Sequence, residues 1–158
     1  MNELFGLPAH ILLLHAIVIF APVAGLLAIG YSWAPPIRKY IGWALFGLAV
    51  LNVPLAWITT ETGEQLEEQR PENNLIEAHA AQGNALPLIA VLFLIAAVLL
   101  FLAYDSLALR LMPWLAKARA VPALKIVVSV LASAASIWFI YQTIVTGHSG
   151  ALAVWTGK

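Results

Sequence analysis

Four long apolar stretches, separated by shorter polar segments, dominate the pattern of hydrophobic and polar positions along the chain. Each stretch holds about 20 residues with almost no charge, which is the length that an α-helix needs to cross a hydrocarbon core of about 30 Å. The pattern predicts membrane-spanning helices over residues 11–33, 41–60, 83–104 and 122–146. Little chain is left for a soluble domain, so we expect an all-α integral membrane protein in which residues 1–158 form one four-helix bundle.

The composition agrees with a membrane location and narrows the chemistry. Hydrophobic residues make up 62% of the chain and charged residues 10%, whereas about a quarter of an average soluble domain is charged. Cysteine is absent, which excludes disulfides, thiolate metal ligands and iron–sulfur ligation. The first residues lack the basic segment and cleavage site of a signal peptide, so we expect the first apolar stretch to be retained as a membrane span.

Basic and acidic residues are divided between the two ends of the predicted bundle. Four spans place the connections 34–40 and 105–121 on one side, and these connections carry most of the lysines and arginines. The termini and the connection 61–82 lie on the other side and carry mostly acids. Because basic loops favour the cytoplasm, we expect an N-out/C-out topology in a bacterial cytoplasmic (inner) membrane, with both termini in the periplasm or the extracellular space.

All four histidines of the chain fall at this predicted outer face. Two of them, His10 and His15, lie in the first turns of the first predicted helix. His79 precedes the third span on a helical extension, and His148 follows the fourth span, where Gly147 predicts the end of the helix. The shared face makes a common site for these histidines a reasonable hypothesis.

Depth and spacing suggest how the histidines divide. His15 lies about 6 Å inside the first apolar stretch at 1.5 Å per residue, where a titratable group is a candidate functional residue. We expect it to be buried and to meet His79 or His148 across the bundle. The five-residue spacing turns His10 and His15 about 140° apart around a helix, so we do not expect both to bind one small ion. His10 is expected to serve a second centre or the outer rim.

Imidazole side chains are common ligands of metals, and helical bundles build such sites between facing helices. One interpretation is a haem b with an axial histidine from each of two helices, in a slot left by small neighbours. These small residues are Ala9, Ala16, Ala78, Ala80, Ala81 and Gly83. A second interpretation is a copper or zinc site made by three or four histidines, with glutamates as oxygen ligands or supporting partners. The residues of this site would be His10, His15, His79, His148, and Glu77, Glu64 or Glu61. A third is that the histidines only hydrogen-bond to loop carbonyls or lipid headgroups.

Other polar and small residues are expected to serve folding. The acidic run ETGEQLEEQRPE (61–72) is typical of a solvated outer loop. Asn52 lies deep in the second span, and we expect its side chain to hydrogen-bond to another helix. The stretches AGLLAIG (24–30) and SVLASAAS (129–136) allow helices to approach closely. Pro87 is expected to kink the third span.

The segments LPAHILLLHAIVIFAPVA (7–24), EAHAAQG (77–83) and GHSGALAVW (147–155) resemble an uncharacterised family of small bacterial four-helix membrane proteins, and the resemblance covers nearly the whole chain. Members of that family begin with a His-Pro-x-x-x-His element, carry a further histidine before the third helix, and end with a Gly-His-x-Gly-Gly element. Here Ile11 stands where the family often has proline, and Ala151 where it often has a second glycine. Relatives fused to Rieske-type or cytochrome-like domains imply an electron-transfer setting, which places haem or another redox metal ahead of zinc.

The sequence holds no Ser-His-Asp arrangement, nucleotide-binding loop or His-Glu-x-x-His element. We therefore expect an electron-transfer or metal-binding protein rather than a catalyst, with a histidine-ligated redox centre at the outer face. The expected cofactor is haem b, or alternatively copper or zinc. The alternative functions are a copper- or zinc-binding membrane protein and an accessory subunit of a respiratory membrane complex. The expected partners are membrane lipid, a respiratory-chain or periplasmic redox protein, and a second copy of the chain, but not nucleic acid.

Overall fold

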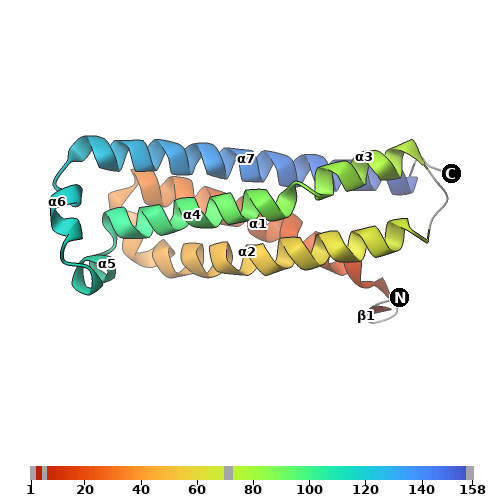
Figure 1. Ribbon diagram of the computed structural model, residues 1–158, viewed down its shortest axis with the longest axis horizontal. Coiled ribbons are helices and arrows are strands. Elements are labelled where there is room, and N and C mark those ends of the chain that lie inside the picture. The colour runs from red at the N-terminus through yellow and green to blue at the C-terminus, as the bar shows by residue number, and fades with distance from the viewer. Residues whose placement is uncertain (1–2, 5–6, 70–72, 156–158) are drawn as a thin grey trace.

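The computed structural model describes residues 3–4, 7–69 and 73–155 of the chain. It is a bundle of long helices (Figure 1). In chain order its elements are β1 (Glu3–Leu4), β2 (Leu7–Pro8), α1 (Ala9–Trp33), η1 (Pro35–Ile37), α2 (Arg38–Glu67), α3 (Asn74–Gly83), α4 (Leu86–Tyr104), α5 (Ser106–Leu111), α6 (Leu115–Arg119) and α7 (Pro122–Trp155). Apart from β1 and β2, which pair in antiparallel fashion, every regular element in these ranges is helical.

Four helical stretches among the described residues are long and apolar enough to cross a membrane. They are His10–Trp33, Pro35–Glu67, Asn74–Tyr104 and Pro122–Trp155. The prediction of an all-α fold with four helices of membrane-spanning length is therefore confirmed. Insertion into a membrane and the side on which the termini lie stay predictions.

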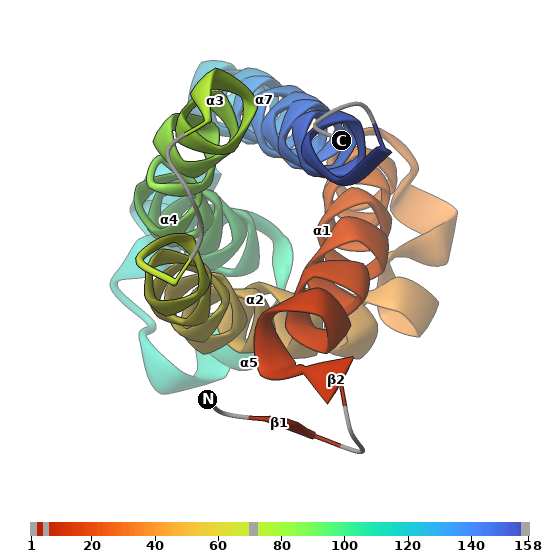
Figure 2. The ribbon, with the colours of Figure 1, turned by 90° about the vertical axis from the view of Figure 1, so that its right-hand side faces the viewer.

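The long helices occupy the four corners of the bundle, which Figure 2 shows end-on. α1 packs against α2 and α7, and α4 packs against the same two helices, so α1 and α4 lie at opposite corners. At one end of the bundle α1 begins and α7 ends, and we call this the histidine end. The opposite end holds η1, α5 and α6, and we call it the basic end.

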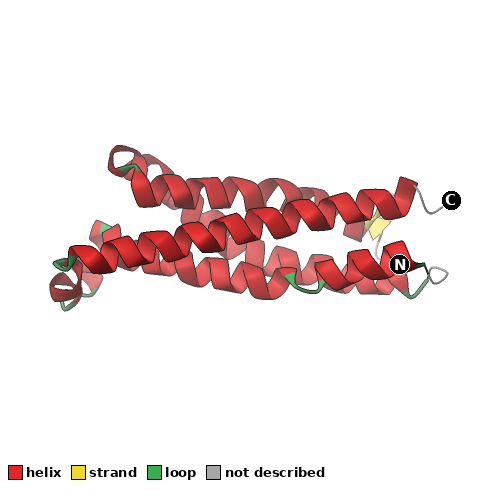
Figure 3. Cartoon of the chain, turned by 90° about the horizontal axis from the view of Figure 1, so that it is seen from above, coloured by secondary structure: helices red, strands yellow, loops and turns green. Residues whose placement is uncertain are grey.

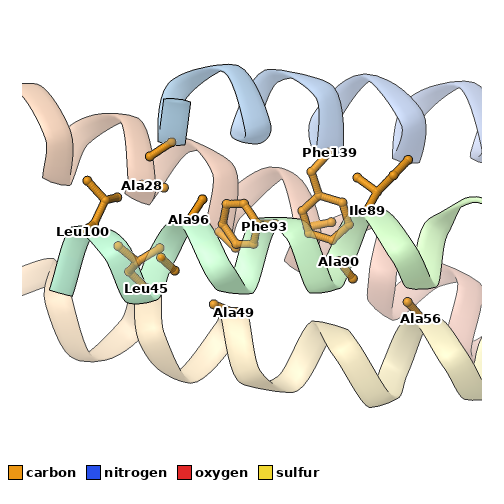
Figure 4. Close-up of a cluster of buried hydrophobic side chains, with 14 of the residues drawn as sticks. Ala28, Leu45, Ala49, Ala56, Ile89, Ala90, Phe93, Ala96, Leu100 and Phe139 are labelled. Carbon is orange, nitrogen blue, oxygen red and sulfur yellow. The ribbon is translucent and has the colours of Figure 1, made fainter. Parts of the chain in front are cut away.

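Buried positions on each long helix recur at alternating intervals of three and four residues. On α2 they are Gly42, Leu45, Ala49, Asn52, Ala56 and Thr59, and on α7 they are Ser129, Ala132, Ser136, Phe139, Thr143 and Thr146. This seven-residue repeat is the one that lets helices pack side by side with a small crossing angle. Near the middle of the bundle, Phe93 and Phe139 lie together with ring centres 5.1 Å apart, and alanines fill the space around them (Figure 4).

The predicted close approach of helices is confirmed between α1 and α7. A Cβ atom added to Gly25 would lie 2.8 Å from the Cδ1 atom of Ile140. Further toward the basic end, the indole Nε1 of Trp33 donates a hydrogen bond to the hydroxyl of Ser133 over 2.9 Å. Small residues on both helices thus bring the two backbones into contact.

Two arginines at the basic end satisfy carbonyl groups that helix ends leave without a partner. Arg38 donates to the carbonyls of Tyr31 and Ser32 over 2.7 and 2.9 Å, at the end of α1. Arg119 donates to the carbonyls of Leu102 and Asp105 over 2.7 and 2.6 Å, at the end of α4. The guanidinium of Arg38 also lies 3.8 Å from the ring centre of Tyr104. These basic residues therefore stabilise the fold directly.

The helices extend further at the histidine end than the sequence predicted. α2 continues through most of the acidic run to Glu67, and α7 continues through Gly147 to Trp155. A glycine inside a helix costs about 1 kcal/mol relative to alanine, and close packing compensates for this cost here. The Cβ position of Gly147, for example, lies 3.2 Å from Val18 of α1. The predictions of a loop from residue 61 and of a helix end at Gly147 are therefore wrong.

Two predictions about the interior also need correction. The third span is interrupted at residues 84–85, where Figure 3 shows a short break between α3 and α4. Pro87 lies in the first turn of α4, where the missing N–H costs little, so it does not kink the middle of a span. Asn52 donates to the carbonyl of Leu48 in its own helix over 2.9 Å, and within the described residues it makes no bond to another helix.

Candidate functional site

His10 lies in the first turn of α1 and points toward α2. Its Nδ1 donates a hydrogen bond to the carbonyl oxygen of Thr59 over 2.9 Å. Its ring packs against Gly63, where an added Cβ atom would lie 2.8 Å from the ring carbon Cε1. Only a glycine at residue 63 leaves room for the imidazole in this position. The end of α2 that the sequence predicted to be a loop thus holds and orients His10.

His79, on α3, has matching surroundings on α7. Its Nδ1 donates to the carbonyl oxygen of Thr146 over 3.1 Å. Its ring packs against Gly150, where an added Cβ atom would lie 2.9 Å from Cε1. Each histidine therefore bonds to one carbonyl of a neighbouring helix. It also packs against the glycine that lies four residues after that carbonyl on the neighbouring helix.

A hydroxyl completes the same arrangement on both sides. Thr62 donates to the carbonyl of Thr59 over 3.1 Å, and Ser149 donates to the carbonyl of Thr146 over 2.9 Å. Both supporting segments thus have the pattern Thr-x-x-(Ser/Thr)-Gly, over residues 59–63 and 146–150. The bundle consists of two similar helical hairpins, α1–α2 and α3/α4–α7. Each hairpin has a histidine near the start of its first arm and this pattern near the end of its second.

The two imidazoles face each other across the bundle. The ring centres of His10 and His79 are 6.0 Å apart, and the ring planes are inclined at 76°. A carbonyl oxygen can only accept a hydrogen bond, which assigns the proton of each neutral ring to Nδ1. The Nδ1 of His79 also lies 3.1 Å from the hydroxyl of Ser149, whose own proton is donated to the Thr146 carbonyl. Each Nε2 then carries a lone pair of the kind that can bind a metal. Hydrogen bonding of the other ring nitrogen to a carbonyl is the usual way in which proteins orient a ligating histidine.

The distance between these rings is compatible with one shared metal ion. Two imidazoles that each bind one metal at about 2.0–2.1 Å have ring centres about 5 Å apart at a tetrahedral ion and about 6.3 Å apart when they bind on opposite sides of it. The separation of His10 and His79 lies at the upper end of this range. No group of three or more His, Cys, Asp or Glu side chains able to hold a metal occurs among the described residues. Within the described residues, the pair could therefore offer two side-chain ligands to a metal.

The other predicted site residues lie elsewhere on the surface. His15 is exposed, and its Nδ1 bonds to the carbonyl of Ile11 in its own helix over 2.6 Å. The prediction that His15 is buried and meets another histidine is wrong, because a helix that turns His10 and Ile17 toward the core turns residue 15 outward. His148 and Glu77 are also exposed. The structure therefore pairs His10, rather than His15, with His79.

α2 and α7 are longer than a helix needs to be to cross a membrane core, and the histidine pair lies near their ends at the histidine end. α2 has 30 residues and α7 has 34, so they are about 45 and 50 Å long, against a hydrocarbon core of about 30 Å. A core that begins next to Lys39 and Lys125, at the basic end, would end near Thr60 and Thr146 by this rise per residue. The rings of His10 and His79, which pack at the level of residues 59–63 and 146–150, would then lie at this boundary or up to about one turn beyond it.

Four residues of this site were not among the sequence-based candidates: Thr59, Gly63, Thr146 and Gly150. The signal that could have found them is the Thr-x-x-(Ser/Thr)-Gly pattern, which occurs at the same end of two spans. Among the small residues predicted to flank a cofactor, Gly83 has open space at its Cβ position and does not contact either ring. No family model, curated protein or solved structure matches the chain.

Proposed function

We propose that His10 and His79 are the two protein ligands of a haem b, and that the protein transfers electrons at the outer face of a bacterial cytoplasmic membrane. The observation that carries this proposal is the pairing of two imidazoles across the bundle, each bonded through Nδ1 to a backbone carbonyl. Both Nε2 atoms would then be free to hold the haem iron.

The number of protein ligands favours haem over copper or zinc. A structural zinc site takes four protein ligands and a catalytic one takes three, whereas a haem iron takes four nitrogens from the porphyrin and needs only axial ligands from the protein. In the described part of the chain the histidine pair has no third ligating side chain beside it. Two histidines therefore suit a haem better than a metal ion held by side chains alone.

The residues of the chain would orient the ligands and tune their strength. The carbonyls of Thr59 and Thr146 would hold the two rings in one tautomer, and the hydrogen bond that each accepts from Nδ1–H would make Nε2 a stronger ligand. Gly63 and Gly150 let the rings approach the helix backbones closely. When bound, the haem supplies one-electron chemistry, and a respiratory-chain or periplasmic redox protein would supply or accept the electron.

Charge supports the orientation that this function requires. Arg38 and Arg119 cap helix ends, so part of the basic bias has a structural cause. Lys39, Arg110 and Lys117 are exposed at the same end, and they alone still favour the cytoplasm for it. The histidine pair would then face the periplasm or the extracellular space.

An absorbance spectrum and a metal analysis of the detergent-purified protein test the proposal. We expect a Soret band and iron close to one equivalent per chain. Copper or zinc without a Soret band would show that the protein binds one of these metals rather than haem. Neither haem nor metal, even after hemin is added, would contradict the proposal and favour an accessory subunit without a cofactor.

A further inference from the structure

The hydroxyl of Thr146 differs from the other buried hydroxyls of the bundle. Ser32, Ser136, Thr59 and Thr143 each donate to the carbonyl four residues earlier in the same helix, over 2.8, 2.7, 2.6 and 2.7 Å. Thr146 is 1% exposed, and its Oγ1 has no hydrogen-bond partner in the part of the chain that the structure describes. A buried polar atom of this kind is costly unless something else bonds to it.

A second buried oxygen, on the helix that packs next to Thr146, is also without a protein partner among the described residues. The side-chain oxygen Oε1 of Gln82 is buried and unbonded within the described ranges. Gln82 lies three residues after His79, on the same side of α3 and one turn deeper in the bundle. Gln142 donates to the carbonyl of Gln82 over 3.0 Å, and His79 donates to that of Thr146. These bonds place Gln82 and Thr146 on adjacent helices within one turn of each other.

We propose that Gln82 and Thr146 bind a buried water molecule directly beneath His79. The amide oxygen of Gln82 can only accept, so the water donates one hydrogen bond to it. The hydroxyl of Thr146 can donate to the water or accept from it. Two partners are the minimum that a buried water needs, and a single water removes the cost of both unbonded oxygens.

The water would distinguish two otherwise similar halves of the site. On the α1–α2 side, the hydroxyl of Thr59 already bonds to the carbonyl of Leu55. The position that corresponds to Gln82, three residues after His10, is Leu13, which has no polar side-chain atom. Of these corresponding positions, only those on the α3–α7 side carry buried side-chain oxygens without a partner among the described residues, so a water would lie beneath His79 and not beneath His10.

Replacing Thr146 by valine tests the proposal through the direction of the change in stability. Valine has nearly the shape of threonine, so Thr146→Val should leave stability unchanged or raise it if the hydroxyl is unbonded. If the hydroxyl holds a water, the substitution should lower the midpoint of thermal unfolding in detergent by about 2 to 4 °C. Thr143→Val is the matched control, because it makes the same change one turn away at a hydroxyl that bonds within its own helix.

A second substitution tests whether one water bridges both residues. Gln82→Met alone should lower the midpoint, and adding Thr146→Val should lower it little further, because either change already removes the water. A midpoint for Thr146→Val equal to or above that of wild type would overturn the proposal. Fully additive effects of Gln82→Met and Thr146→Val would also overturn it. Since the readout is unfolding of samples matched in cofactor content, the result is independent of whether the protein binds haem.

Discussion

The imidazole rings of His10 and His79 lie with their centres 6.0 Å apart, although they belong to opposite corners of the bundle. Each ring bonds to a carbonyl and packs against a glycine of the second arm of its own hairpin. Nearer the middle of the bundle, the buried polar residues Asn52 and Ser136 donate only to carbonyls of their own helices among the described residues.

Alanine substitutions at Gly63 and Gly150 should disturb the two rings. The added methyl group would lie 2.8 and 2.9 Å from the nearest ring carbon, so the imidazole must move. We expect each variant to lose about 1–3 kcal/mol of unfolding free energy through overpacking. Chemical unfolding in detergent micelles measures this loss.

Gly47→Ala is the control for these variants. Gly47 lies in the same helix as Gly63, and its Cβ position has nothing within 4 Å. Its replacement should leave stability unchanged or raise it by up to about 1 kcal/mol, since alanine favours the helix. If Gly63→Ala and Gly150→Ala were as stable as Gly47→Ala, the close packing of the rings against the glycines would be refuted.

Replacement of Arg119 by methionine should destabilise the basic end. The guanidinium donates to three carbonyls at the end of α4, those of Phe101, Leu102 and Asp105, and methionine cannot replace these bonds. We expect a loss of about 1–3 kcal/mol in unfolding free energy, and Arg119→Lys should recover only part of it because an ammonium lacks the planar fork. Lys117→Met, at an exposed position, removes the same charge and should change stability by less than about 0.5 kcal/mol. If Arg119→Met and Lys117→Met lowered the unfolding free energy equally, loss of charge rather than loss of the hydrogen bonds to the helix end would explain the effect.

The absence of cysteine allows a direct test of the orientation. A single cysteine replacing Glu68, which is exposed beyond the end of α2, should react with a membrane-impermeant thiol reagent in intact cells. A cysteine replacing Lys117 should react only after the membrane is opened, because the basic end is predicted to be cytoplasmic. The reverse labelling pattern would invert the topology and place the histidine pair inside the cell.

The sequence was sufficient to predict the four helices and the end of the bundle at which the histidines gather. Long uncharged stretches dictate the helices, because a backbone in lipid must satisfy its own hydrogen bonds. The ends of the helices were harder to predict. Gly147 and Gly150 are typical stop signals, yet α7 continues past both because their backbones pack against Val18 and His79.

The pairing of the histidines was hard to predict for the same reason, because it depends on contacts between helices. Depth in the apolar stretch favoured His15, but depth along a helix does not say which side of the helix faces the core. The core side of α1 becomes evident when His10 and Ile17, seven residues apart, are taken with the buried positions of α2 and α7. The same repeat places Gly63 and Gly150 opposite the histidines. A search for seven-residue spacing across all four spans could therefore have identified the site.

The central claim is that His10 and His79 together bind one haem, and the absorbance spectrum of histidine variants tests it most directly. Wild type and the variants His10→Ala, His79→Ala, His15→Ala and His148→Ala would be purified in parallel, and the Soret absorbance would be compared per folded chain. Circular dichroism would establish that each variant is folded. We expect the bis-histidine spectrum to be lost in His10→Ala and His79→Ala and kept in His15→Ala and His148→Ala, in which the replaced residue is exposed. Full haem occupancy in folded His10→Ala or His79→Ala, or its loss in His15→Ala, would contradict it.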